Sequence, residues 1–118
     1  MGHKIYEMPF SKVYPLLKAK LNRKNIDENK VDLAITWLTG YNKREISKIV
    51  ENKIGYKEFF KKAPKLNEDR FLVTGSICGV RITEIEEELM KEIRILDKVI
   101  DELSKGKDID KIIKKEGK

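Results

Sequence analysis

Apolar residues recur along this chain at spacings of three and four, the period that places them on one side of an α-helix. The longest such run begins at Ile85, and its six apolar residues lie four, four, three, four and three positions apart. Thr83 and Glu86 have the spacing of a capping box at its start, and Gly106 is a stop signal at its end. The pattern predicts one long helix over about 83–105.

Shorter periodic runs lie on either side of the long helix. A first helix is expected over 11–24, where Pro15 removes one backbone hydrogen bond, so that the helix either begins near this proline or has an irregular first turn. Asp27 is a suitable N-cap for the next helix, since its carboxylate can accept from free N–H groups. A further short helix is expected over 56–63, and Asn67 and Asp108 are expected to cap another short turn and a final short helix.

The sequence TGYN, residues 39–42, predicts a sharp corner between two helices. Gly40 is a stop signal, because glycine readily adopts the left-handed conformation that ends many helices. Asn42 and Glu45 have the spacing of a capping box, which starts the next helix at once. Local chemistry alone therefore predicts this corner.

The segment FLVTGSICGVRI, residues 71–82, is ambiguous. Gly75 and Ser76 lie between two short apolar runs, as in a tight β-hairpin turn. Gly79 interrupts the second run, however, and an isolated two-stranded hairpin is only marginally stable in water. An irregular buried connection is favoured over a short hairpin.

These elements together predict an all-α protein, a compact bundle of five to seven mostly short helices around one long C-terminal helix. The length of 118 residues suits a single helical domain over 1–118 with one modest core. Hydrophobic residues make up 40% of the chain and charged residues 39%, a balance that is too apolar for disorder and suits short amphipathic helices.

The composition argues against several functions. One cysteine cannot form an internal disulfide, and one histidine leaves too few soft ligands for a zinc site. No apolar run reaches the roughly 18 residues of a membrane span, the first residues lack the continuous apolar region typical of a signal peptide, and no stretch matches a nucleotide-binding glycine motif. We therefore expect a cytoplasmic protein without cofactor, metal or membrane contact.

The net charge of +6 is unevenly distributed. Residues 1–65 hold 15 basic and 7 acidic residues, whereas residues 66–118 hold 11 basic and 13 acidic residues. This asymmetry hints at an acidic partner for the first half. A solvated, lysine-rich surface is the simpler interpretation, because no arginine-dense patch accompanies the charge.

The corner within residues 28–52 matches part of a DNA-binding helix-turn-helix, which needs a turn glycine and exposed polar side chains on its second helix. The size of Thr36 and the negative charge of Glu45 weaken this match, so a plain helical corner is the favoured interpretation. The residues that would contact nucleic acid are Lys43, Arg44, Ser47 and Lys48.

A second candidate site combines Cys78 and Arg81 with the nearby start of the long helix, where a thiolate or an anion could be stabilised. A catalytic thiol needs a positioned base, and the sole histidine, His3, is remote in the sequence. A buried, unreactive cysteine is therefore favoured.

Trp37 lies on a different side of its predicted helix from Val31 and Leu38, so this helix is apolar on two sides. Either the helix is central in the fold, which is the favoured interpretation, or one side meets another chain.

Three stretches, KIYEMPFSKVYPLLKAK, ITWLTGY and TGSICGVRITEIEEELMKEIRILDKVIDELSKGK, resemble the signature blocks of the bacterial domain-of-unknown-function 2200 family. The resemblance spans nearly the whole chain. It implies a stand-alone cytosolic bacterial protein without an assigned activity, cofactor or catalytic residue, so no functional residue is carried over. The stretches that carry the resemblance are where we expect a shared pocket or interaction surface, with the candidate residues Tyr14, Trp37, Tyr41, Cys78 and Arg81.

The function most consistent with these observations is a non-enzymatic protein-interaction module. A homodimer is one expected form of it, joined through the long helix or the helix that contains Trp37. The alternative is weak nucleic-acid binding at the corner, and the third hypothesis is a small-molecule or thiol-dependent site near Cys78 and Arg81.

Overall fold

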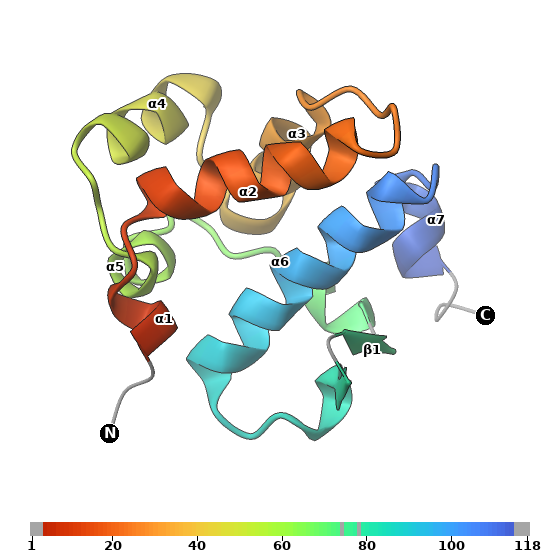
Figure 1. Cartoon of the computed structure of the whole chain (residues 1–118). Coiled ribbons are helices and arrows are strands. Elements are labelled where there is room, and N and C mark those ends of the chain that lie inside the picture. The colour runs from red at the N-terminus through yellow and green to blue at the C-terminus, as the bar shows by residue number, and fades with distance from the viewer. Residues whose placement is uncertain (1–3, 74, 78, 115–118) are drawn as a thin grey trace.

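One long helix, α6 (Glu88–Ser104), crosses the molecule, and the other elements surround it (Figure 1). The computed structural model describes residues 4–73, 75–77 and 79–114. Of the residues of α6, all of them described, only Glu88 is well exposed. The predicted fold class is confirmed: the chain is a helical bundle around one long C-terminal helix. The elements that contact α6 include α2 (Phe10–Asn22), α3 (Lys30–Thr39), α5 (Tyr56–Lys61), α7 (Ile109–Lys114) and strand β1 (Ser76–Ile77).

The long helix begins at Glu88 and not near Thr83, so the predicted start is wrong. Residues Ile82–Glu84 form a separate 3-10 turn, η2. Ile82 is buried, and its N–H donates to the Gly75 carbonyl at 2.9 Å. This contact anchors the chain before α6, so the expected capping box of Thr83 does not begin the helix.

Helix α2 runs from Phe10 with Pro15 inside it. The N–H of Lys12 donates to the Pro9 carbonyl, three residues back, at 2.9 Å, which tightens the first turn. Of the two expected arrangements, the irregular first turn is the one observed. The buried side of α2 consists of Phe10, Val13, Leu17 and Leu21.

The short helix α1 (Lys4–Glu7) was not expected from the sequence. It contacts α5, and the segment that follows it pairs with the start of α5. The N–H of Phe10 donates to the Ile54 carbonyl at 2.7 Å, and the N–H of Tyr56 donates to the Met8 carbonyl at 2.9 Å. These bonds join two segments that lie far apart in the sequence.

The predicted corner between α3 and α4 (Lys43–Glu51) is confirmed. Gly40 ends α3 with a φ of 84°, in the left-handed region. The N–H of Glu45 donates to the Asn42 side chain at 2.8 Å, and the N–H of Asn42 donates to the Glu45 carboxylate at 2.9 Å. At the other end, α3 begins at Lys30 with Asn29 as its N-cap, so the predicted N-cap Asp27 is wrong. The Asp27 carboxylate accepts from the N–H of Asn29 in the turn before the helix.

The ambiguous segment contains a short antiparallel hairpin, so the favoured irregular connection is wrong over residues 76–81. Strand β1 pairs with β2 (Val80–Arg81), with Ser76 opposite Arg81 and Ile77 opposite Val80. The turn therefore lies between Ile77 and Val80 and not at Gly75–Ser76. The 3-10 turn η1 (Glu68–Leu72) precedes the hairpin and is capped by Asn67, as expected.

Stacked aromatic rings join α2, α5 and the corner. The rings of Phe10 and Phe59 are parallel, with centroids 4.2 Å apart. The Tyr41 ring lies 5.3 Å from Phe59, and its hydroxyl donates to the Phe59 carbonyl at 2.7 Å. These contacts hold α3 and α4 at a fixed angle to the rest of the core.

Candidate functional site

The outward side of α3 carries apolar side chains that the core leaves wholly or partly exposed. Val31, Ala34, Ile35 and Leu38 face inward and are buried. On the opposite side Leu33 is 61% exposed, and Trp37, one helical turn later, is only half-buried. The predicted two-sided character of this helix is therefore present in the structure, and the outward side is the strongest candidate site.

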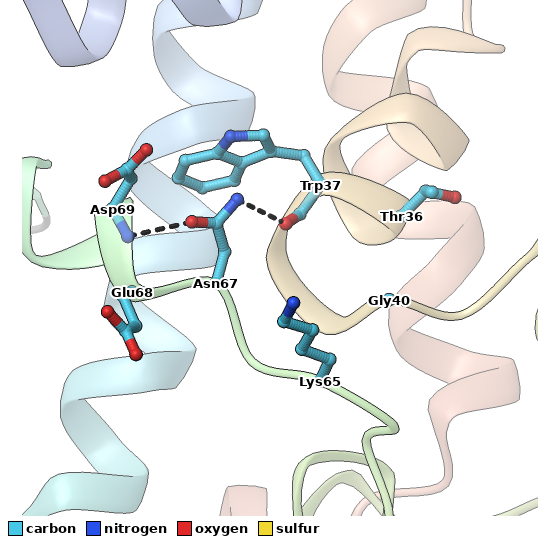
Figure 2. A pocket seen from close by; sticks show the side chains of 7 residues that line it. All are labelled: Thr36, Trp37, Gly40, Lys65, Asn67, Glu68 and Asp69. Carbon is cyan, nitrogen blue, oxygen red and sulfur yellow. Dashed lines mark hydrogen bonds between the residues drawn. The ribbon is translucent and has the colours of Figure 1, made fainter.

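A hollow of about 530 Å³ lies at the C-terminal end of α3 (Figure 2). Its lining combines the end of α3 with the segment before η1. We name it the Asn67 hollow, and the residues that line it are Thr36, Trp37, Gly40, Lys65, Asn67, Glu68 and Asp69.

The segment 65–67 closes this hollow by satisfying the last carbonyl groups of α3. The N–H of Lys65 donates to the Thr39 carbonyl at 3.0 Å, and the N–H of Asn67 donates to the Leu38 carbonyl at 2.9 Å. The Asn67 side-chain amide donates to the Trp37 carbonyl at 3.1 Å, while its oxygen accepts from the Asp69 N–H at 2.8 Å (Figure 2). One asparagine thus joins the end of α3 to the start of η1.

A second hollow of about 590 Å³ adjoins the first and shares Thr36 and Trp37 with it. We name it the Asp32 hollow; its other lining residues are Asp27, Asn29, Lys30, Asp32, Leu33 and Lys43.

Asp32 connects three helices at this hollow. Its carboxylate accepts a short hydrogen bond from the Tyr14 hydroxyl on α2, and its other oxygen lies 3.9 Å from the Lys43 ammonium on α4. The Asp32 side chain is only 11% exposed, whereas that of Lys43 is 75% exposed. Burial, reinforced by the hydrogen bond with Asp32, raises the pKa of Tyr14 well above its ordinary value. Tyr14 therefore stays a neutral hydrogen-bond donor. The Asp32 carboxylate is held closely by the Tyr14 hydroxyl and only at a longer distance by the Lys43 ammonium.

A third hollow of about 320 Å³ continues along α3 and shares Lys30 and Leu33 with the second. It also involves Leu103 at the end of α6 and Asp108 and Ile109 at the start of α7. We call the three adjoining hollows together the α3 groove. Its lining is apolar at Leu33 and Trp37 and also carries charged side chains.

Of the other residues expected in a shared pocket, Tyr14, Tyr41 and Arg81 do not line this groove. Tyr41 is buried, and its hydroxyl is used by the Phe59 carbonyl. Burial is the main cause that raises the pKa of Tyr41 to about 12. Arg81 is exposed on β2, and its guanidinium lies 3.6 Å from the Glu84 carboxylate. Strand β1 of this hairpin lies on the other side of α6 from α2 (Figure 1). Cys78 lies outside the described residues.

The residues proposed for nucleic-acid contact lie on the exposed side of α4. Lys43, Arg44, Ser47 and Lys48 are all exposed. Lys43 is partly engaged by Asp32, whereas Arg44 and Lys48 make no ion pair within the described chain. The side chain of Glu45 is occupied by the capping box.

Sequence reasoning missed the residues that line the groove opposite Trp37. Asn67 was recognised as a cap for the next turn, but nothing local indicates that its amide reaches a carbonyl 30 residues earlier. Asp32 follows the buried Val31 directly, so the helical pattern does not mark it as a buried position. Its burial depends on Tyr14, which belongs to another helix. Within this groove, the only signal in the sequence was the position of Trp37, an apolar residue outside the side of the helix that faces the core.

Neither a metal site nor a membrane span is found in the described parts of the chain. In residues 4–73, 75–77 and 79–114, no three His, Cys, Asp or Glu side chains are grouped as metal ligands would be. Likewise, none of the described helices combines the length and apolarity required to cross a bilayer.

Fold and site together define a small helical protein with an amphipathic surface groove beside one internal long helix. A family model described as "Uncharacterized protein conserved in bacteria (DUF2200)" matches residues 4–114. The chain therefore belongs to the DUF2200 family, as its signature blocks indicated. A solved structure, titled as that of the uncharacterized protein SP1917, is similar to it at 42% sequence identity and a TM-score of 0.89. That alignment covers 100% of this chain and 97% of the other. Among curated proteins, none matches this chain.

Proposed function

We propose that this protein is a non-enzymatic interaction module that binds a protein partner through the α3 groove. The observation that carries the proposal is the position of Leu33, which is 61% exposed one helical turn from the half-buried Trp37. Apolar surface of this kind, surrounded by charged residues, is typical of sites that bind another protein. An aromatic anchor such as Trp37 at the centre is characteristic of residues that dominate binding energy.

The structure favours α3 over α6 as the docking helix. The residues of α6 are buried or half-buried after Glu88, because helices and the hairpin cover it on several sides. A second copy would have no continuous side of α6 to contact. Of the two surfaces expected for a homodimer, only the outward side of α3 offers free apolar area.

The chain provides a matched pair of residues that tests this proposal. Leu16 on α2 is 62% exposed, almost the same as Leu33, but it does not line the α3 groove. We expect a tagged wild-type protein to retain specific proteins from a bacterial lysate, Leu33→Ser to lose them, and Leu16→Ser to keep them. Light scattering on the purified proteins separates self-association from binding of another chain. Equal retention by all three proteins would contradict a docking role for the groove.

Nucleic-acid binding by α4 is a second candidate, favoured by Arg44 and Lys48, which are exposed on one helix and form no ion pair with any residue that the structure describes. Such contacts would act mainly through phosphate charge, so binding should weaken steeply with salt. We expect any binding of labelled duplex DNA at about 50 mM salt to fall several-fold in Arg44→Gln with Lys48→Gln. Absence of binding at that salt concentration would remove this candidate.

A further inference from the structure

We propose that the α3 groove recognises a basic amphipathic segment of its partner, in which bulky apolar side chains contact Leu33 and Trp37 and Lys or Arg side chains pair with Asp32 and Asp69. The inference rests on the proposed docking function and adds the chemistry of the partner. The proposed partner is another protein and not a second copy of this chain.

The charge of the groove is opposite to that of the chain as a whole. The chain carries a net charge of +6. Among the described residues, however, the groove is lined by five carboxylates, Asp27, Asp32, Glu68, Asp69 and Asp108, and by three lysines, Lys30, Lys43 and Lys65. A local excess of negative charge on a basic protein favours a positively charged partner and opposes an acidic one. It also opposes a symmetric dimer that places one groove against another.

Asp32 is the first predicted anchor for a partner cation. Its carboxylate is nearly buried, and the distance of 3.9 Å to the exposed Lys43 ammonium is long for an ion pair. A long pair to an ammonium group that is 75% exposed contributes little free energy, so a partner cation can replace Lys43 at small cost. Inside a covered interface the new pair would be better shielded from water, which strengthens it.

The Asn67 hollow provides the second anchor. The Trp37 indole and the Asp69 and Glu68 carboxylates surround it (Figure 2). Neither carboxylate makes an ion pair in the part of the chain that the structure describes. A guanidinium or ammonium group placed here would meet both an aromatic ring and negative charge, the combination that favours cations.

The spacing of the apolar anchors fits a helical or strand-like segment of ordinary size. Leu33 and Trp37 are four residues apart on one helix, so their side chains are separated by about 6 Å along the axis. Apolar side chains at positions i and i+4 of a partner helix have the same separation. Positive residues on either side of such a pair would reach the charged ends of the groove.

Selection from a random 12-residue peptide library displayed on phage tests the partner chemistry without assuming a sequence. The full chain is the bait, and phage that also bind Leu33→Ser are removed. We expect the remaining peptides to combine bulky apolar residues with an excess of Lys and Arg. Trp37 is the only tryptophan in the chain, so tryptophan-free versions of these peptides can be titrated by its fluorescence.

Two exposed substitutions then separate charge recognition from loss of fold. Lys43→Met removes the competing cation, so we expect the selected basic peptide to bind several-fold more tightly, whereas Lys48→Met leaves its affinity unchanged. Asp69→Asn should weaken it about five-fold, a change of about 1 kcal/mol, while Glu51→Gln on α4 has no effect. Equal affinity of wild type, Lys43→Met and Asp69→Asn would overturn the proposal.

The selection also distinguishes this inference from the proposed function. Groove-dependent peptides with neutral or acidic composition would overturn the basic partner and leave the docking function standing. No groove-dependent peptide at all would overturn both.

Discussion

The Arg70 guanidinium on η1 and the Glu92 carboxylate on α6 form an ion pair at 3.2 Å with side chains only 9% and 5% exposed. Arg70 also donates to the Asn67 carbonyl at 2.8 Å, and its guanidinium lies over the Phe71 ring. Burial raises the pKa of Glu92, although the neighbouring Arg70 opposes that effect. The pair therefore fixes η1, and with it one wall of the Asn67 hollow, to the central helix.

Replacing Arg70 with Met should destabilise the protein at pH 7 by about 3 kcal/mol, because an unpaired carboxylate remains buried. The loss of stability should be smaller at lower pH. Because burial raises the pKa of Glu92, its carboxyl becomes protonated and neutral in the folded protein as the pH falls, and the cost of a buried charge is then removed. Urea unfolding at pH 7 and pH 4 measures both effects. The double variant Arg70→Met with Glu92→Leu should regain much of the stability; a double variant no better than Arg70→Met would contradict this account.

Glu102 should contribute to stability with a pH dependence of the opposite sign. Burial alone would raise its pKa, but hydrogen bonds and charges from Lys107 at 2.7 Å and Lys98 at 2.9 Å outweigh burial and lower the pKa from 4.5 to about 2. Its contribution is complete above pH 4.5 and is lost as the pH falls toward 2. We expect Glu102→Gln to cost about 2 kcal/mol at pH 7 and to flatten the loss of stability in acid.

The exposed Glu86→Gln serves as the control for Glu102→Gln, and both are compared by urea unfolding between pH 7 and pH 2.5. If wild type and Glu102→Gln lose stability in parallel over this range, the lysines do not hold the carboxylate as described.

Gly40 should tolerate alanine much less well than Gly106. Both have positive φ, at 84° and 90°, so each substitution costs about 1 kcal/mol of backbone strain. A Cβ at Gly40 would lie 3.2 Å from the backbone N and O of Lys65, whereas one at Gly106 would meet nothing within 4 Å. Thermal unfolding should show Gly40→Ala to be less stable than Gly106→Ala by at least about 1 kcal/mol. Equal melting temperatures would argue against the close approach of Lys65 to the end of α3.

Asn67 makes two hydrogen bonds that two substitutions can separate. Asn67→Asp keeps the oxygen that accepts from the Asp69 N–H but loses the donor to the Trp37 carbonyl, whereas Asn67→Ala loses both. We expect Asn67→Ala to cost about 2 kcal/mol and Asn67→Asp to cost less. Trp37 fluorescence reports the change locally, and its emission should shift toward that of exposed tryptophan in both variants. An unchanged spectrum in Asn67→Ala would contradict the coupling of Asn67 to α3.

The sequence was most informative where structure depends on neighbours in the chain. Gly40, Asn42 and Glu45 form the predicted corner because a helix stop and a capping box act within a few residues. The long apolar run likewise became the central helix, because its spacing alone determines which side is buried. Segments with these local sequences would form the same elements in many other proteins.

Prediction failed where distant segments decide the outcome. The local signal at Thr83 favoured a helix, but burial of Ile82 and its bond to Gly75 turned the chain into η2 instead. The candidate site was predicted only in part for the same reason. Trp37 was identified, whereas Asn67 and Asp69 reach it from a segment 30 residues later.

The internal position of α6 also bears on how this chain is synthesised. Helices α2 and α3 leave the ribosome long before Glu88, yet the apolar surface that they need lies on α6. Until that helix emerges, the surface of α2 and α3 that packs on α6 has no partner, and its aliphatic side chains remain open to chaperones and proteases. Folding of this protein is thus concentrated near the end of translation, and a nascent chain stalled before residue 88 should be degraded rapidly.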